Sequence, residues 1–205
     1  MVPLLILFKM NSEIQILEKP DQMSWDDIHE VLWQAHSKNR EEGVVMRYPS
    51  LPGEEIRKRV EGKGKMFVAI LSEKLIGTSA VIFKDKSLWC GKGKYAYCCF
   101  DSVLPQLQGT GVYRKLCQKR EEFVKNEGVS RMLLDTNESN NREKIVVVKA
   151  GFKPVDLVWW TDHYNVVFVK WLNGCPLSNF RCKLGFSVRK IMVKSKRFIK
   201  TLFKD

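Results

Sequence analysis

Hydrophobic and polar residues in the first third of the chain follow one strand pattern and two helix patterns. Apolar and polar positions alternate in EIQILEK at 13–19, which predicts a strand. A helix is predicted over 24–43, because Ser24 and Asp27 form a capping-box pattern at its start and a glycine ends it. Its buried face is expected to contain Ile28, Val31, Leu32 and Ala35. A shorter helix is predicted over 53–62.

Long apolar runs dominate the middle of the chain. Strands are predicted over 65–72 and 74–83, joined by a tight turn near Glu73. A third long strand, YAYCCFDSVL at 95–104, leads into the loop PQLQGTG. The residues that follow have apolar positions every three or four residues, which predicts a helix over 112–126.

The next segment contains one ambiguous stretch between predicted strands. A strand is predicted over 131–136. In NNREKIVVVKAGF at 140–152, the β-branched residues favour a strand, but an asparagine at the start and a glycine at the end favour a helix, which we predict. Strands over 156–161 and 165–172 follow. This order predicts an α/β fold, a single domain with a mixed, mostly antiparallel sheet and helices on both faces.

Length and charge indicate how the chain is divided. At 205 residues and 44% hydrophobic content, the chain suits one well-buried domain, which we assign to 12–172. Residues 1–11 are interpreted as an N-terminal extension, with Met10 as an alternative start. Eight of the twelve net positive charges lie in 173–205, so the basicity belongs mainly to a tail.

The tail is predicted to be a basic amphipathic helix. In FSVRKIMVKSKRFIKTLFKD at 186–205, apolar residues recur at intervals of three and four and leave most cations on the other face. One interpretation is that the apolar face packs on the domain or on a second subunit in a homodimer. The other is that it lies on the anionic inner surface of a membrane. The tail lacks the interleaved aromatic residues typical of nucleic-acid binding, so no nucleic-acid partner is expected.

The cysteines and histidines do not form a metal-binding pattern. None of the six cysteines belongs to a C-x-x-C pair and there are only three histidines, so we expect no metal site and reduced thiols in a cytoplasmic protein. The apolar run in MVPLLILFKM is too short to span a bilayer and lacks the flanks of a signal peptide.

The loop after the third long strand is the main candidate for binding chemistry. Gly109 and Gly111 lie between Pro105 and the start of a helix. Glycine permits close approach of a ligand to the backbone, and a helix start presents free N–H groups, so the loop predicts an anion site, most simply for phosphate. No G-K-[ST] follows, and the third glycine of a dinucleotide motif is missing. Taken alone, the loop also fits a plain glycine turn.

The ordered set of motifs gives the loop a more specific meaning. A long strand, V-x-P at 103–105, the glycine loop, a helix, a strand, and then Asn140 followed by Gly-Phe at 151–152 occur in this order. The set resembles the GNAT superfamily of acyl-CoA-dependent N-acyltransferases, and the resemblance covers about residues 12–172. No single motif is specific, but the order of all of them is.

The superfamily signature [QR]-x-x-G-x-[GA] fits the loop in two frames. One frame uses Gln106, Gly109 and Gly111. The preferred frame uses Gln108, Gly111 and Tyr113, because it aligns the V-x-P and a helix leucine as in the family. In that frame a tyrosine departs from the small residue that is usual at the last position.

The resemblance implies acetyl-CoA as cosubstrate, with no metal. The backbone amides of 108–113 would hold the pyrophosphate, and the pantetheine arm would pair with the strand end at 102–104. The implied cofactor-binding residues are Ser102, Val103, Leu104, Gln108, Gly109, Thr110, Gly111, Val112, Tyr113 and Asn140.

The implied reaction is direct attack of a primary amine on the thioester in a ternary complex. The amine must first lose a proton, and a backbone N–H near Val103 is the candidate donor to the oxyanion. Many family members place a tyrosine, as acid for the thiolate, where this chain has Val147. Tyr113, Tyr164, Tyr97 or water are the alternatives.

The candidate catalytic residues are Asp101, as general base, and Tyr97, which occupies the place of a glutamate in some relatives. Their spacing of four residues predicts that both side chains lie on one face of the strand. The alternative is a structural role for Asp101, as a carboxylate bound to neighbouring groups at a strand end. His163 lies at a predicted hairpin tip, where a solvated turn residue is the default.

The acceptor is less well defined by the sequence. Aromatic residues are plentiful in the segments expected to surround it, and they are Trp33, His36, Tyr48, Trp89, Trp159, Trp160 and Tyr164. Core packing is the first interpretation for Trp33 and Trp160. Similarity of DTNESNN and HYNVVFVKWL to bacterial GNATs of surface-glycan biosynthesis makes a small-molecule amine, first an amino sugar, the expected acceptor. Protein amines come second, polyamines or antibiotic amines third, and a non-catalytic acyl-CoA-binding module is the rival interpretation.

Overall fold

The computed structural model describes residues 13–46, 48–85, 93–159 and 163–173, and four tail residues at 186–187 and 190–191. The strands are β1 Gln15–Glu18, β2 Gly64–Leu71, β3 Lys74–Asp85, β4 Lys94–Val103, β5 Arg131–Asn137, β6 Lys153–Trp159 and β7 Tyr164–Trp171. The helices are α1 Trp25–Ala35, α2 Ser37–Glu41, α3 Gly53–Val60, α4 Val112–Asn126 and α5 Asn141–Lys149, with short 3₁₀ turns at Tyr48–Ser50 and Pro105–Leu107.

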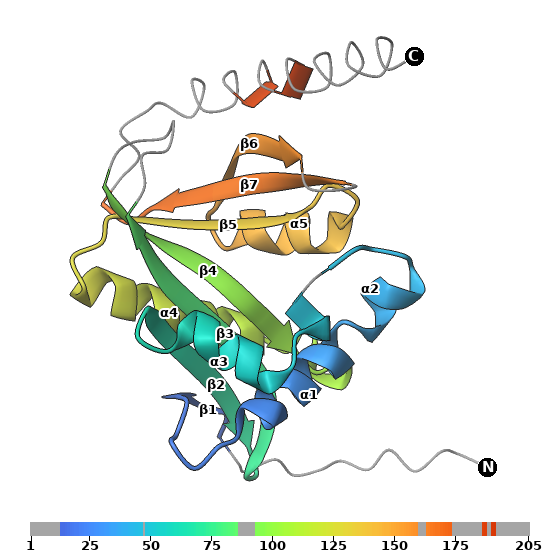
Figure 1. The fold of residues 1–205 in the computed structure, drawn as a ribbon, viewed down its shortest axis with the longest axis vertical. Coiled ribbons are helices and arrows are strands. Elements are labelled where there is room, and N and C mark those ends of the chain that lie inside the picture. The colour runs from blue at the N-terminus through green and yellow to red at the C-terminus, as the bar shows by residue number, and fades with distance from the viewer. Residues whose placement is uncertain are drawn as a thin grey trace.

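The seven strands form one mixed sheet in the order β1-β2-β3-β4-β5-β7-β6 (Figure 1). Its neighbours are antiparallel except for β4 and β5, which are parallel. This central pair is joined only at Ala96↔Met132 and Tyr97↔Leu133. Beyond these residues β4 and β5 separate, so the sheet is open along the carboxyl-terminal half of β4.

Helices cover both faces of the sheet, which confirms the predicted fold class. On one face, α1 and α3 pack over β2, β3 and β4 through a cluster that includes Ile28, Leu32, Ile56 and Val60 (Figure 1). On the other face, α4 packs through Val112, Leu116 and Val124, and α5 packs through Val147. Burial of these apolar faces is the main favourable term that holds the helices against the sheet.

Most predicted elements agree with the structure, and the main exception is the first helix. Ser24 caps α1 through a capping box, and the predicted apolar face is buried. The single helix expected over 24–43 is wrong, because the chain breaks at His36 into α1 and α2. His36 has φ −102° and ψ 13°, and its ring bonds to the backbone of β4, which fixes the break in place.

The ambiguous segment at 140–152 forms the predicted helix, α5, although it is rich in β-branched residues. Its N-cap, Asn140, accepts a hydrogen bond from the Glu143 N–H, which offsets the weaker helix propensity of the valines. The strand predicted to begin at Asp156 begins earlier, at Lys153. Helix α4 has the predicted bounds.

Several other predictions concern individual tryptophans and the two ends of the chain. Trp33 is 42% exposed, with the Arg40 guanidinium 3.6 Å from its ring centroid, so core packing is wrong for this residue. Residues 1–11, Trp89, Trp160 and most of 173–205 lie outside the described residues. No helix in the described part of the chain has the length and hydropathy needed to cross a membrane.

Four described residues give the only view of the predicted tail helix. Phe186 is partly buried and packs against the main core cluster. The Lys190 Nζ lies 3.4 Å from Glu138 Oε1, and Ile191 is exposed. The membrane, packing and dimer interpretations of the tail remain predictions.

Candidate active site

The geometry of the site begins with a β-bulge in β4. Thr78 pairs with Ser102 and Ala80 with Cys99, so Ser79 on β3 lies opposite two residues, Phe100 and Asp101. Phe100 takes the bulge conformation with φ +55°, which is uncommon for a large side chain. The extra residue reverses which face of the sheet each later side chain of β4 points to.

The expectation that Tyr97 and Asp101 share a face of the strand is therefore wrong. Tyr97 packs with the cluster beneath α1 and α3, where its hydroxyl hydrogen-bonds with the Tyr48 hydroxyl at 2.9 Å and donates to Asp135. Asp101 instead pairs with Arg120 of α4, on the other face. Alternation by two predicts a shared face only for a regular strand, and the bulge removes that regularity.

The Asp101 carboxylate is held by three donors. Its Oδ1 accepts from Ser79 Oγ at 2.7 Å and from Arg120 Nη1 at 2.5 Å, and its Oδ2 accepts from the Tyr113 hydroxyl at 3.3 Å. The Arg120 side chain is fully buried, so Asp101 supplies the counter-charge that its burial requires. The alternative interpretation, a structural role for Asp101, is therefore supported by a specific ion pair with Arg120.

The free edge of β4 presents backbone groups toward the cleft. The Leu104 N–H donates to Ile76 on β3, at 2.9 Å. Because successive residues of a strand point their backbone groups to opposite sides, the N–H and C=O of Val103 point to the edge that β5 has left. Two contacts agree, since the Val103 carbonyl accepts from Gln108 Nε2 at 3.1 Å and the Asp101 carbonyl accepts from His36 Nε2 at 3.2 Å.

The glycine loop next to this edge has the conformation of an anion site. Gly109 and Gly111 have φ of +83° and +93°, and a Cβ at either position would meet no protein atom within 4 Å. Gly111 is the N-cap of α4 and provides no side-chain cap. The backbone amides of Gly109, Gly111 and Val112 have no acceptor among the described residues. The loop therefore presents several unpaired N–H groups at the positive end of a helix dipole.

A cleft of about 740 Å³ extends from this loop along the edge of β4. Seven of the predicted cofactor-binding residues line it, namely Ser102, Val103, Gln108, Gly109, Gly111, Tyr113 and Asn140. The other three do not. Leu104 and Val112 are buried in the core, and the exposed Thr110 donates from its hydroxyl to the Leu107 carbonyl at 2.7 Å.

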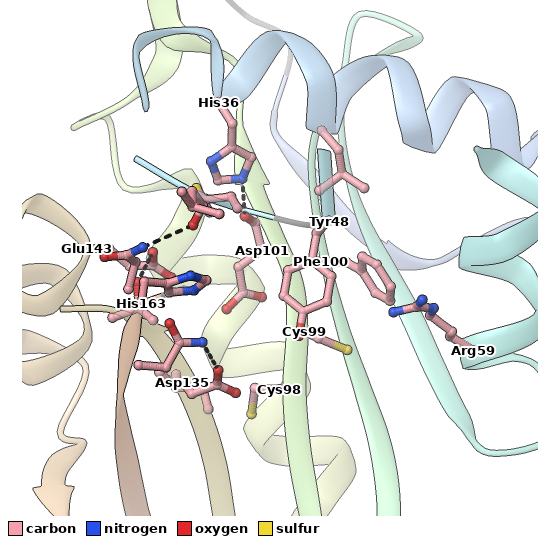
Figure 2. A pocket seen from close by; sticks show the side chains of 17 residues that line it. His36, Tyr48, Arg59, Cys98, Cys99, Phe100, Asp101, Asp135, Glu143 and His163 are labelled. Atoms are coloured by element: carbon pink, nitrogen blue, oxygen red, sulfur yellow. Dashed lines mark hydrogen bonds between the residues drawn. The ribbon is translucent and has the colours of Figure 1, made fainter. Parts of the chain in front are cut away.

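A second, smaller cavity of about 130 Å³ lies where β4 and β5 separate (Figure 2). Its wall is assembled from distant segments, and the polar lining residues are His36, Tyr48, Arg59, Asp101, Asp135, Thr136, Asn137, Glu143, His163 and Asn165. Asp135 accepts from Tyr97 and from Asn165 Nδ2, so a chain of hydrogen bonds runs from Tyr48 to β7. His163, expected as a solvated turn residue, lines this cavity.

The hydrogen bonds of His36 define its tautomer. Its Nε2 must carry the proton, because the Asp101 carbonyl can only accept, and its Nδ1 accepts from Asn39 Nδ2 at 3.2 Å. Burial lowers the pKa of the ring, while the bond to the Asp101 carbonyl opposes that shift. Burial also raises the pKa of the thiols of Cys98 and Cys99, which argues against a thiolate nucleophile here.

Glu143 was not identified from the sequence. It occupies the third position of α5, where a glutamate is an ordinary helix-start residue. Its Oε2 accepts from Thr136 Oγ1 at 2.5 Å and from Asn140 Nδ2 at 2.8 Å. Burial raises its pKa to about 7, against the lowering effect of the Thr136 bond, and the charges of Asp101 and Asp135 raise it further. Glu143 differs from an ordinary helix-capping residue only in its position, because its side chain lines both cavities.

Within the described ranges, no three His, Cys, Asp or Glu side chains gather in the manner of metal ligands.

Sequence comparison assigns the chain to a family. The profile of the acetyltransferase (GNAT) family matches residues 25–152, which include α1, the glycine loop and α5. The chain belongs to the GNAT acetyltransferase family. Comparison with curated protein sequences gave no match.

Solved structures share the fold at low sequence identity. An acetyltransferase from Streptococcus agalactiae is 20% identical with TM-score 0.61, over 78% of this chain and 98% of that one. An aminoglycoside 6′-N-acetyltransferase complexed with coenzyme A is 14% identical with TM-score 0.61, over 80% and 99%. A GNAT acetyltransferase from Elizabethkingia anophelis with acetyl-CoA bound is 15% identical with TM-score 0.57, over 78% and 98%.

Proposed function

We propose that this protein is an N-acetyltransferase that moves an acetyl group from acetyl-CoA to the primary amine of a small molecule, with amino sugars as the first class of acceptor. One observation carries the proposal. The long cleft beneath the glycine loop and the smaller cavity meet, and His36, Asp101 and Glu143 line both. Two substrates entering by separate routes would bring their reacting atoms together at these side chains, as direct transfer in a ternary complex requires.

The glycine loop supports acetyl-CoA as the cosubstrate. Its unpaired N–H groups suit the pyrophosphate, and the open edge of β4 suits the amide groups of the pantetheine arm. Relatives of the same fold are solved with coenzyme A or acetyl-CoA bound. Backbone amides and the helix dipole can supply the counter-field for the phosphates, so the proposal includes no metal.

The chemistry that we propose is direct attack of the amine nitrogen on the thioester carbonyl carbon. The Val103 N–H points to the open edge of β4 and is the candidate donor to the oxyanion. As the C–S bond breaks, the thiolate accepts a proton. Tyr113 lines the cleft with a hydroxyl that carries a proton at neutral pH, which makes it the candidate acid in place of the family tyrosine.

The charge of the smaller cavity supports a cationic acceptor. Three carboxylates line it, those of Asp101, Asp135 and Glu143, together with the guanidinium of Arg59. Because Arg120 neutralises Asp101, the acidic groups left to face an acceptor are Asp135 and Glu143. Such a cavity favours an ammonium group, and the amide and hydroxyl groups around it suit a polyhydroxylated molecule. Two of the proteins with this fold are aminoglycoside 6′-acetyltransferases, which supports sugar-derived amines as the first compounds to test.

The test is consumption of acetyl-CoA by the full chain with a panel of amines. The panel contains glucosamine, a 6′-amino aminoglycoside, spermidine and a lysine-containing peptide. Turnover of the sugar amines is the expected result, and turnover of the peptide alone would indicate a protein-amine acetyltransferase. Calorimetric binding of acetyl-CoA without turnover of any amine would contradict the proposal and favour a non-catalytic acyl-CoA-binding module.

A further inference from the structure

The junction of the two cavities limits which side chain can deprotonate the acceptor. The thioester would come from the cleft and the amine from the smaller cavity, so the proton acceptor must reach the place where these meet. His36, Asp101 and Glu143 are the described residues that line both. A general base must lie within hydrogen-bond reach of the proton that it removes, so these three are the candidates.

His36 already has both ring nitrogens engaged. Its Nε2 donates to the Asp101 carbonyl at 3.2 Å, and its Nδ1 accepts from Asn39. Accepting a substrate proton would require the ring to give up the Asn39 bond and to carry a charge in a buried place, which burial already disfavours. His36 is better explained as the residue that joins the break between α1 and α2 to the edge of β4.

Asp101 is engaged by the buried cation beneath it. Protonation of its carboxylate would leave the fully buried Arg120 guanidinium without a counter-charge. Its other two donors, Ser79 and Tyr113, occupy further lone pairs of the carboxylate. The role of Asp101 that the contacts favour is to fix Arg120 and Tyr113 below the cleft.

Glu143 is the remaining candidate and keeps one oxygen available. Both of its donors, Thr136 and Asn140, bond to Oε2, and Oε1 makes no hydrogen bond with the described residues. Figure 2 shows Glu143 on the α5 side of the cavity, across from Asp101 on β4. We propose that Glu143 is the general base that removes a proton from the acceptor ammonium. This inference rests on the proposed N-acetyltransferase function.

The surroundings of Glu143 suit a base that works near neutral pH. Burial raises its pKa to about 7, and the negative charges of Asp101 and Asp135 add to the effect. The other titratable or charged groups that line the same cavity are His36, Tyr48, Arg59, Cys98, Cys99 and His163, and the adjoining cleft adds Lys38, Arg114 and Arg142. On its own helix, Arg142 pairs with Glu42, and Lys144 donates to the Glu138 carbonyl, so neither cation is bound to the Glu143 carboxylate.

The step balances without any further reactant. The ammonium gives one proton to the Glu143 carboxylate, and the free amine then forms the C–N bond with the carbonyl carbon. When the C–S bond breaks, the nitrogen loses its second proton to solvent, and the thiolate takes one from Tyr113 or solvent. Tyr113 and Glu143 return to their starting states by exchange with water. The overall products are the amide, coenzyme A thiol and one proton.

The competing explanation is that Glu143 only supports the start of α5. In that case Oε2 and its two donors would be the whole of its role, and an uncharged isostere would serve as well. Glu143→Gln separates the two, because its amide oxygen can still accept from Thr136 and Asn140 but cannot take up a proton near neutral pH. Glu127→Gln, at the exposed end of α4, is the matched control.

The experiment uses the full chain, acetyl-CoA and whichever amine of the panel the wild-type protein turns over best. Glu143→Gln is expected to lower kcat/KM about 100-fold, with acetyl-CoA affinity within about 2-fold of wild type. The wild-type rate should rise with pH to a plateau near the pKa of Glu143. The residual rate of the variant should instead keep rising with the fraction of free amine, up to about pH 9.

The result that would overturn the proposal is a Glu143→Gln variant with the wild-type pH profile and kcat/KM within about 3-fold of the control. If this variant fails to fold, Glu143→Asp is measured instead. Glu143→Asp should keep the fall in rate at acidic pH but have a lower kcat than wild type. A Glu143→Asp variant with the wild-type kcat would also refute the proposal. A wild-type protein that binds acetyl-CoA but acetylates no amine would refute the proposed function, whereas normal turnover by Glu143→Gln refutes only the role of Glu143.

Discussion

The two halves of the candidate site are built in different ways. The long cleft combines backbone groups of one continuous stretch, the end of β4, the glycine loop and the first turn of α4, with walls from the α1–α2 break and from α5. The smaller cavity, the proposed acceptor site, depends on side chains from α1, α3, β4, β5, α5 and β7. Short-range geometry makes the first, and the packing of the whole sheet makes the second.

This difference affects how each half of the site selects its substrate. Backbone amides at a helix start bind any phosphate of suitable shape, so many members of a family can keep one cofactor with little constraint on side chains. A cavity walled by Tyr48, Asp135 and Asn165 from three separate segments can change its acceptor when any one side chain changes. Variants in the two halves should therefore affect the two substrates separately.

The largest effect is expected in the cofactor cleft. Gly111→Asp should lower acetyl-CoA affinity at least about 100-fold, because it adds a negative charge and bulk beside the expected diphosphate and disturbs charge-assisted hydrogen bonds. Calorimetry with acetyl-CoA measures this. Any residue other than glycine is strained at φ +93°, so Gly93→Asp, at φ +94° and outside the cleft, is the matched control. Equal affinities of the two variants would exclude the loop from the cofactor site.

The next effect concerns the group where the two halves meet. Asp101→Asn should lower the free energy of unfolding by about 3 kcal/mol, because Arg120 would remain buried without a counter-charge. Denaturant unfolding measures the loss, and Asp101→Asn/Arg120→Met should recover part of it, since no charge is then buried alone. A variant of full stability that lacks the acidic limb of the pH–rate profile would instead make Asp101 the base, as first expected from the sequence.

A smaller effect is expected for the acceptor alone. Asp135→Asn should raise the KM of the amine about 10-fold, because a charged partner for the ammonium is lost. The affinity for acetyl-CoA should be unchanged, in contrast to Gly111→Asp. Asp85→Asn, at the exposed end of β3, is the control. A change in acetyl-CoA affinity with no change in the amine KM would show that the two halves are not separable in this way.

The smallest effect is the contribution of Glu143 to stability as the pH changes. The pKa of Glu143 is raised from 4.5 to about 7 in the folded chain. Below pH 4.5 the side chain is protonated in both the folded and the unfolded states, so it does not lower the free energy of unfolding there. Between these values the unfolded chain binds fewer protons than the folded one, and stability falls as the pH rises. Glu143→Gln should therefore be about 1–2 kcal/mol more stable than wild type near pH 8 and equal near pH 4.5. Denaturant unfolding across this pH range measures the difference in the free energy of unfolding between the variant and wild type. A difference that does not change with pH would contradict the raised pKa of Glu143.

The sequence alone predicted the features that depend on neighbours along the chain. The capping box at Ser24, the helix starting at Val112 and the glycine loop each involve residues a few positions apart, so propensity, capping and φ requirements define them locally. The order of these elements was enough to indicate the GNAT family, which the profile match over 25–152 confirms.

Tertiary structure decided what each side chain faces. The bulge at Phe100 turned Asp101 away from Tyr97 and toward Arg120, which no period-of-two pattern could anticipate. The helix over 24–43 broke at His36 because its ring bonds to β4 across the fold. Glu143 looked like a helix-start residue until the fold placed it between the two cavities, where Thr136 of β5 donates to its carboxylate. The pKa of a carboxylate depends on charges and solvent in three dimensions, so only the folded chain could raise it.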